Sequence, residues 1–317
     1  MDGARLCLES IVLLGDGARS ALWAGKDAKV ELIDCRLSSS VPGESCAPAL
    51  LRAEAGAEVS LRGCRIDHAP RDVASISVAG HGTQVRLKAT TIAPSRRAAK
   101  LVVEAKITDG AVLELIECSI QLEGYIVCCG PSTLVLRQSR INGPGEGWEG
   151  WREEYRPAIA VDDVSRLVAK RTVFSGVSIG ARREADLTLI RCRFERSPAI
   201  QERLPQYLTL TDYAVATLSQ CALEGSSPPP VRSDDDALVR FAGCAFEDFV
   251  SESAVRDAMR SEGRGSVEFF GKNAYGAGAR PAPTDVALPA MPARPGVAAP
   301  LERSDDAAAV LMRQVVV

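Results

Sequence analysis

An eight-residue pattern of apolar and polar positions recurs along the chain, in the order apolar, any, apolar, any, any, Cys, any, apolar. Its apolar positions are two, three and two residues apart, whereas one face of a helix returns about every 3.6 residues. Spacings of two are typical of strands with one buried face, and the interval of three marks a corner. The clearest copies are 30–37, 59–66, 113–120, 187–194 and 239–246.

Weaker copies of the same pattern bring the total to eleven. They are 6–13, 85–92, 134–141, 167–174, 216–223 and 267–274. The sixth position moves from residue 11 to residue 272 in ten steps, which is a mean period of about 26 residues. A period of this size is typical of solenoid proteins.

A third apolar segment lies upstream of most copies and is followed by a turn rich in Gly or Asp. Examples are 22–24, 76–78, 126–128, 159–161, 177–179 and 208–210. Three short strands per repeat predict an all-β fold, a parallel β-helix of about eleven coils over residues 1–277. At a strand spacing of about 4.8 Å these coils would form a rod roughly 50 Å long.

The cysteine at the sixth position is predicted to point inward and to form a buried ladder, in which a thiol acts as a small apolar filler. Its members are Cys35, Cys64, Cys118, Cys192, Cys221 and Cys244. Neighbouring coils lie close enough to allow an occasional disulfide. The chain has no pair of cysteines or His-Cys cluster with zinc spacing, so we expect no metal and no cofactor.

The repeat resembles that of the pectate-lyase-like superfamily of right-handed parallel β-helices, which includes carbohydrate-binding and sugar-hydrolase repeats. The resemblance covers residues 5 to about 276. It implies a right-handed coil and says little about chemistry, because one fold carries many functions. It also implies where an enzyme of this kind would keep its acidic residues.

Lyases of that superfamily bind calcium through carboxylates clustered on one outer face. The expected outward positions of the first strand hold none, being Trp23, Ser77, Val127, Ala160, Ser178 and Thr209. Hydrolases of the polygalacturonase type carry aspartate motifs ahead of a Gly-His-Gly, but here Asp162-Asp163 follows Gly80-His81-Gly82. We therefore interpret His81, these aspartates and 234–236 as turn residues, and we predict no catalytic residue.

Four arginines are expected on the outer face of the third strand: Arg36, Arg65, Arg140 and Arg193. They share this row with Thr91, Ser119 and Val173. Stacked arginines could receive an anionic chain such as a uronan or a phosphate backbone. Alternatively, acids such as Glu195 and Asp67 neutralise the row and leave a solvated face.

The longest interval between copies contains three aromatic residues, Trp148, Trp151 and Tyr155. It belongs to the connections between the third strand of one coil and the first strand of the next, where insertions concentrate. Such rings stack on sugars and also dominate protein interfaces. They could equally fold back over the coil as a lid.

The two ends of the rod differ in sequence. Residues 251–263 are predicted to form a short helix with a serine N-cap and with Val255 and Met259 on one face. Beyond it, 278–317 is an extended Pro/Ala-rich tail, whose final segment could cap the last coil or dock on another subunit. The first coil has no obvious cap, so that end is expected to need a partner or a self-association contact.

Composition limits the function further. The net charge of −3 and the pI near 5.7 provide no basic field for nucleic acid, and no stretch has the 18 apolar residues of a membrane span. No signal peptide is recognised, so we expect a cytoplasmic protein without membrane contact. We predict a non-catalytic scaffold or recognition module that binds a protein partner or self-assembles. The alternative is a carbohydrate-binding or polysaccharide-cleaving protein.

Overall fold

The computed structural model describes residues 4–15, 20–39, 49–67, 74–93, 102–122, 124–143, 157–196, 207–224, 231–258 and 265–282. The chain divides into a compact unit, Met1–Val286, and a second unit, Ala287–Val317. The second unit lies wholly outside the described residues. The predicted tail, 278–317, therefore lies outside them apart from its first few residues.

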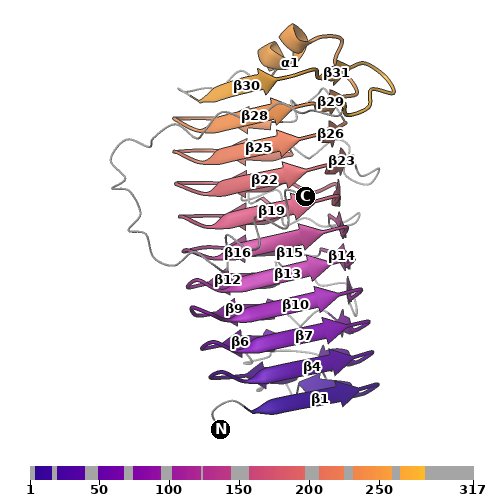
Figure 1. The fold of residues 1–317 in the computed structure, drawn as a ribbon, viewed down its shortest axis with the longest axis vertical. Coiled ribbons are helices and arrows are strands. Elements are labelled where there is room, and N and C mark those ends of the chain that lie inside the picture. The colour runs from indigo at the N-terminus through magenta and orange to yellow at the C-terminus, as the bar shows by residue number, and fades with distance from the viewer. Residues whose placement is uncertain are drawn as a thin grey trace. The chain divides into compact units, whose positions relative to one another are not determined.

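The compact unit is a right-handed parallel β-helix built from three stacked parallel sheets (Figure 1). Sheet A contains eleven strands, in spatial order β1 (Arg5–Glu9), β4 (Lys29–Ile33), β7 (Glu58–Arg62), β10 (Gln84–Lys88), β13 (Val112–Ile116), β16 (Thr133–Arg137), β19 (Arg166–Lys170), β22 (Asp186–Ile190), β25 (Val215–Ser219), β28 (Leu238–Ala242) and β30 (Ser266–Phe270). The predicted all-β fold of about eleven coils is confirmed.

The other two sheets complete the coils. Sheet B also has eleven strands, β2 (Val12–Gly15), β5 (Arg36–Ser39), β8 (Arg65–Asp67), β11 (Thr91–Ala93), β14 (Ser119–Gln121), β17 (Arg140–Asn142), β20 (Val173–Ser175), β23 (Arg193–Glu195), β26 (Ala222–Leu223), β29 (Ala245–Phe246) and β31 (Ala274–Tyr275). Sheet C has nine, β3 (Leu22–Ala24), β6 (Ala49–Glu54), β9 (Ala74–Ala79), β12 (Val102–Thr108), β15 (Gly124–Cys128), β18 (Ile159–Val161), β21 (Ile179–Ala181), β24 (Leu208–Leu210) and β27 (Val231–Ser233). The single described helix is α1 (Glu252–Ala258).

The eight-residue pattern spans sheet A, a corner and sheet B. In the second coil, Val30 and Leu32 point inward from β4, and Leu37 points inward from β5. Between them Asp34 has a positive φ of 51°, which turns the chain and directs the following Cys35 into the core. The spacing of three in the pattern is therefore this corner.

The predicted cysteine ladder is present, and its thiols are free. Each described thiol of the ladder lies against main-chain carbonyls. The Sγ of Cys64, for example, lies 3.5 Å from the carbonyl oxygen of Leu32 and 3.4 Å from that of Arg62. Polar side chains take the same place in other coils, such as Ser139, whose hydroxyl accepts a hydrogen bond from the Cys118 amide. The position therefore accepts small side chains that can contact or hydrogen-bond the main-chain groups of the corner.

The last copy of the pattern, 267–274, contains one more residue than the others. Ala274 pairs with Ala245 and Tyr275 pairs with Phe246, so Tyr275 takes the inward place that the pattern assigns to Ala274. Asn273 takes the place of the cysteine, because its Oδ1 accepts a hydrogen bond of 2.8 Å from the Cys244 amide. The pattern is wrong here because two residues, Gly271 and Lys272, separate β30 from the inward side chain of this corner, where the coil before has only Gly243.

Turns from sheet C to sheet A are short in every described coil, whereas connections from sheet B to sheet C vary in length. The longest direct one runs from Asn142 to Ile159. The prediction that insertions concentrate at one edge of the rod is confirmed by these strand bounds. This edge is where additional surface can be built without disturbing the ladders.

Candidate functional site

The four candidate arginines lie in one outward row of sheet B. Each of Arg36, Arg65, Arg140 and Arg193 is the first residue of its strand, and the ladder pairs Arg36 with Arg65 and Arg140 with Val173. Thr91 and Ser119 stand between Arg65 and Arg140. The sheet therefore aligns these residues in the order that the repeat predicts.

The two arginines of the first coils converge on one buried carboxylate. Asp67 is only 1% exposed, and its oxygens lie 2.6 Å from Nε of Arg36 and 2.8 Å from Nε of Arg65. Burial opposes the ionised form of Asp67, but the hydrogen bonds from both arginines outweigh it, so its pKa is lowered. Two cationic side chains are thus engaged by a single residue at the end of β8.

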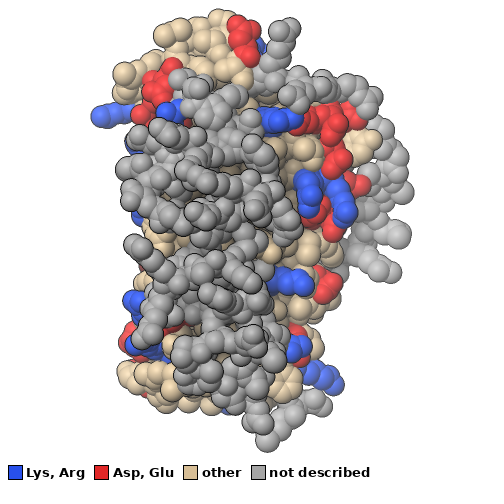
Figure 2. Space-filling model, turned by 180° about the vertical axis from the view of Figure 1, so that it is seen from behind, with Lys and Arg blue, Asp and Glu red and all other residues tan. Residues whose placement is uncertain are grey.

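The other two arginines meet a group of glutamates. Arg140 lies 2.9 Å from Glu195, and Arg193 lies 3.2 Å from the same side chain and 3.6 Å from Glu247. A hydrogen bond to Glu224 is the main cause of a raised pKa for Arg193. All four arginines thus have carboxylate partners. Figure 2, a view from behind, shows basic and acidic side chains next to one another at both margins of the molecule.

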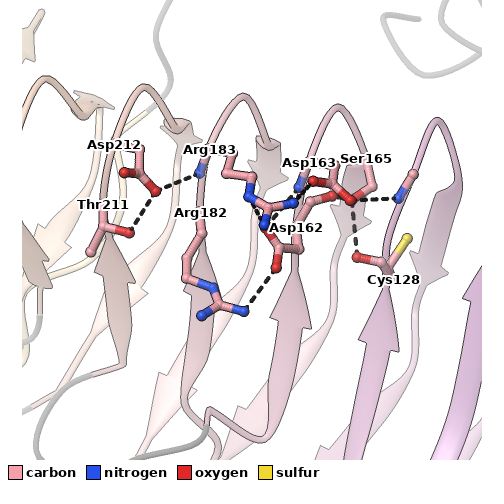
Figure 3. A network of polar contacts seen from close by, with 9 residues as sticks. Cys128, Asp162, Asp163, Ser165, Arg182, Arg183, Thr211 and Asp212 are labelled. Carbon is pink, nitrogen blue, oxygen red and sulfur yellow. Dashed lines mark hydrogen bonds and ion pairs between the residues drawn. The ribbon is translucent and has the colours of Figure 1, made fainter.

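The aspartates between sheets C and A lie in corner turns (Figure 3). The Arg183 amide donates a hydrogen bond of 3.0 Å to Asp212, and the Gly130 amide donates one of 3.4 Å to Asp163. Asp162 lies 2.8 Å from Arg182. Asp163 and Asp212 thus each cap a main-chain amide of the coil before their own, which is a structural use of these carboxylates.

Two further polar turns occupy the same corner. Asp235 accepts a hydrogen bond of 3.3 Å from the Asp212 amide, so the 234–236 run continues the aspartate caps. His81 is exposed between Gly80 and Gly82, which have φ values of 94° and 80°. The turn requires a left-handed backbone on both sides of His81, and this requirement accounts for the two glycines of the Gly-His-Gly motif.

The central outward row of sheet C contains no carboxylate among the described residues, while Glu54 lies on the same face two residues after Arg52 and accepts hydrogen bonds from Arg52 and Trp23. In the observed register this row is Trp23, Arg52, Ser77, Lys106, Val127, Ala160, Gly180, Thr209 and Arg232. The assignment of Ser178 to this row is wrong, because Gly180 pairs with Ala160. Ser178 is buried and its hydroxyl accepts a hydrogen bond from the Ala158 amide. At Gly180 a Cβ would approach the Pro157 side chain to 2.5 Å.

Trp148, Trp151 and Tyr155 lie outside the described residues, as do His68 and Met259. Among the described residues, no three His, Cys, Asp or Glu side chains form a group that could hold a metal ion. The cysteines of the core are unsuited to nucleophilic chemistry. Burial raises the pKa of Cys118 to about 11 and that of Cys128 to about 12, so both stay protonated near neutral pH.

Exposed apolar side chains gather at the first coil, which Figure 1 shows at the N-terminal end of the rod. Leu6 is 44% exposed, Ile11 40%, Val12 57% and Leu14 59%. In β2, Val12 pairs with Arg36 and Leu14 pairs with Ser38, so leucine and valine stand where the next coil has polar residues. The sequence predicted an uncapped end, but the exposed Val12 and Leu14 were not predicted. The signal was the apolar run of 11–14, which breaks the alternation of the other copies.

The last coil is closed by α1, which takes the place of a sheet C strand between β29 and β30. Ser251 is its N-cap, as predicted, and accepts a hydrogen bond of 3.2 Å from the Ala254 amide. Val255 is fully buried and Ala258 packs against the core. Arg256 lies over the Phe269 ring, 4.5 Å from its centroid, and donates to the Val267 carbonyl.

The first coil therefore holds four of the eight exposed large apolar side chains of the described residues. No helix formed by the described residues has the length and apolar character needed to cross a bilayer. Comparison with known proteins finds no matching family model, no matching curated protein and no matching solved structure.

Proposed function

We propose that this chain is a non-catalytic β-helix scaffold that binds an extended strand of another polypeptide at the open edge of β1. The observation that carries this proposal is the group of exposed apolar side chains in the first coil, namely Leu6 in β1 and, after the corner, Ile11, Val12 and Leu14. Large apolar side chains gathered at one place on a protein surface mark an interaction site. Addition of a strand to a free sheet edge is a common way for a domain to bind an extended segment.

The main-chain groups of β1 favour this mode of binding. Ala4 accepts a hydrogen bond of 2.8 Å from the Lys29 amide, and the Ser10 amide donates one of 2.9 Å to Ile33. Residues of even number in β1 therefore direct their main-chain groups toward β4. Because these directions alternate along a strand, Arg5, Cys7 and Glu9 direct theirs toward the open edge. Among the described residues no strand pairs with that edge.

The absence of catalysis is supported by how the polar residues are used. The aspartates of the C-to-A corners cap amides, and the arginine row is engaged by Asp67 and by glutamates of neighbouring coils. Among the described residues, neither the corner aspartates nor the acids beside the arginine row include two uncommitted carboxylates placed to act together on one substrate. The β-helix then serves as a rigid support for its binding edge.

The test uses fluorescein-labelled ten-residue peptides that alternate apolar and polar side chains, titrated with the purified chain and followed by fluorescence anisotropy. Cys7→Pro removes a main-chain donor that faces the open edge, so the β1–β4 ladder stays intact. We expect binding by the wild type and loss of binding in Cys7→Pro. Val250→Lys is the matched control, since Val250 is exposed at the opposite end of the rod.

Two results would overturn the proposal. One is failure of every peptide to bind the wild type at concentrations where the chain is monomeric and its edge is therefore unoccupied. The other is equal binding by wild type and Cys7→Pro when circular dichroism shows that the variant is folded. If Val250→Lys abolished binding as strongly as Cys7→Pro, the contact would lie elsewhere and the proposal would also be rejected.

Carbohydrate binding is the alternative, and the cluster of Trp148, Trp151 and Tyr155 in the longest B-to-C connection favours it. It would agree with membership of the pectate-lyase-like superfamily, which remains a prediction. A panel of polysaccharides tested with the wild type and with the double variant W148A/W151A decides the matter. Binding that is lost in the double variant would support the alternative, and absence of binding to any polysaccharide would reject it.

A further inference from the structure

We infer that the strand bound at the open edge is β1 of a second copy, which runs antiparallel to the first across a two-fold axis at Cys7. The result is a head-to-head dimer in which sheet A continues from one copy into the other. This inference rests on the proposed function and names its partner. Three independent features of β1 support it.

The first feature is the order of side chains along β1, Arg5-Leu6-Cys7-Leu8-Glu9. A two-fold axis at Cys7 places Arg5 opposite Glu9 of the second copy, and Leu6 opposite Leu8 of the second copy. Cys7 then faces its own equivalent. Opposite charges that face each other across an antiparallel pair stabilise it, and like charges destabilise it. The strand is thus complementary to itself in charge and in apolar character.

The second feature is the direction of the main-chain groups. Only Arg5, Cys7 and Glu9 face the open edge, so a two-fold pairing must place these residues opposite one another. With Arg5 opposite Arg5, or Glu9 opposite Glu9, like charges would meet. With Arg5 opposite Cys7, or Cys7 opposite Glu9, the charges would find no partner. The register centred on Cys7 alone satisfies both the hydrogen bonds and the charges.

The third feature is the inward face. Leu6 is 44% exposed, although its equivalents in the next coils, Val30 and Val59, are buried. Leu8 is half-buried and packs against the core. In the proposed pairing the leucines of the two copies meet, so the row of inward side chains continues across the axis. Their removal from water would supply the main driving force.

The opposite end of the rod determines what kind of assembly follows. The Val267 carbonyl in β30 accepts a hydrogen bond from Arg256 of α1, and Glu252 of α1 accepts one from Tyr275 of β31. A strand of another copy would have to displace this helix to pair with β30. Head-to-tail stacking into a filament is therefore blocked, whereas a two-fold contact between first coils closes on itself.

A charge exchange tests the register. Arg5→Glu places two carboxylates opposite each other on both sides of the axis, and Glu9→Arg places two arginines there. The double variant R5E/E9R restores opposite charges. In sedimentation velocity at low salt we expect each single variant to raise the dimer Kd about tenfold or more, equivalent to about 1.4 kcal/mol. The double variant should return to within about threefold of the wild type.

Cys7 provides a second readout, because it is exposed at the proposed axis. Facing residues of a hydrogen-bonded antiparallel pair have Cα atoms about 5.5 Å apart. A short bis-methanethiosulfonate reagent should therefore join two chains covalently in the wild type. It should fail to join them in Cys7→Ser, which keeps every other thiol, including the partly exposed Cys129.

The outcomes separate this inference from the proposed function. Peptide binding by a chain that stays monomeric at high concentration would overturn the second copy as partner and leave the proposed function standing. A dimer that ignores the charge exchange and gives no crosslink through Cys7 would also overturn the inference. Loss of both peptide binding and dimer formation in the wild type would reject the two together.

Discussion

The two ends of the solenoid differ in how their terminal coils are covered. The last coil is covered by α1, with Val255 buried and Arg256 placed over Phe269. The first coil has no such cover among the described residues and exposes Leu6 and Leu14. Each coil of a solenoid buries its neighbours, so the two terminal coils are the ones that the repeat itself cannot complete.

The cores behind the two ends also differ. The last coils contain an aromatic cluster in which Phe246 and Tyr275 stack with centroids 5.7 Å apart and Phe241 and Phe269 stack at 5.3 Å. The first coils are filled by aliphatic side chains such as Leu32 and Leu37. The core of the closed end is therefore filled by stacked rings, while the core of the open end is filled by aliphatic side chains alone. The difference agrees with the proposed use of the open end as a binding surface.

The largest expected effect compares the open end with the middle of the rod. Leu6 and Leu113 occupy the same inward row of sheet A, but Leu113 is fully buried. Leu113→Ala should lower the free energy of unfolding by about 2–5 kcal/mol because it leaves a cavity. Leu6→Ala, measured by urea unfolding at a concentration where the chain is monomeric, should cost much less. Equal losses would show that the first coil is as well packed as the middle.

A smaller effect is expected at the closed end. Val255→Ala removes two methyl groups from a fully buried site in α1 and should lower the free energy of unfolding by about 2 kcal/mol. Val250→Ala is the control, since this residue is exposed at the same end and should change the free energy by less than about 0.5 kcal/mol. If both substitutions were neutral, α1 would not stabilise the last coil.

The arginine row gives a third comparison, between a fully buried acid partner and partly exposed ones. Asp67→Asn should lower the free energy of unfolding at pH 7 by about 1.5 kcal/mol, as expected for hydrogen bonds to a charged group. The pKa of Asp67 is lowered in the folded state, so its contribution is complete above its ordinary value of 3.8. It is lost as the pH falls through the lower folded-state value.

Urea titrations of wild type and Asp67→Asn at several pH values test this dependence. The difference between the two proteins should be largest near neutral pH and should shrink below the ordinary pKa of Asp67. A difference that stays constant down to strongly acidic pH would mean that Asp67 acts through packing and not through its charge.

The smallest effect is expected at the other end of the row. Arg193 is half-exposed and its partners Glu195 and Glu247 are accessible to solvent, so water and salt screen the ion pairs. Arg193→Ala should change the free energy of unfolding by less than about 1 kcal/mol, and added salt should reduce the change further. A loss as large as that of Asp67→Asn would show that the two ends of the row are equally important for stability.

Most of the fold could be predicted because the repeat carries it. The alternation of Val30, Leu32 and Leu37 and the spacing around Cys35 specify two strands and a corner, and this information is local. Sheet C was harder. Its strands are short, so the segment 177–179 fits the pattern while the observed strand is Ile179–Ala181. Neighbour pairing across the ladder, which the sequence does not display, selected the register.

The candidate site shows the same limit. The row of Arg36, Arg65, Arg140 and Arg193 follows from the repeat, and it could be read equally as a receptor for an anionic chain or as a neutralised face. Asp67 engages two of these arginines because β8 places it beside both. The predicted aromatic site at Trp148, Trp151 and Tyr155 stays a prediction, because it lies outside the described residues.

The sequence by itself determined the parallel coil, the buried cysteine ladder and the helix with its serine cap, because each shows as a pattern of a few residues, which for the coil and the ladder recurs about every 26 residues. Only the tertiary structure decided which polar groups neutralise one another and which apolar groups stay exposed. Those outcomes depend on residues one coil apart, such as Arg193 and Glu224, or on the absence of a neighbouring described strand beyond β1. Contacts along the rod axis are long-range in sequence, so the exposed edge of β1 becomes evident only once the coils are stacked.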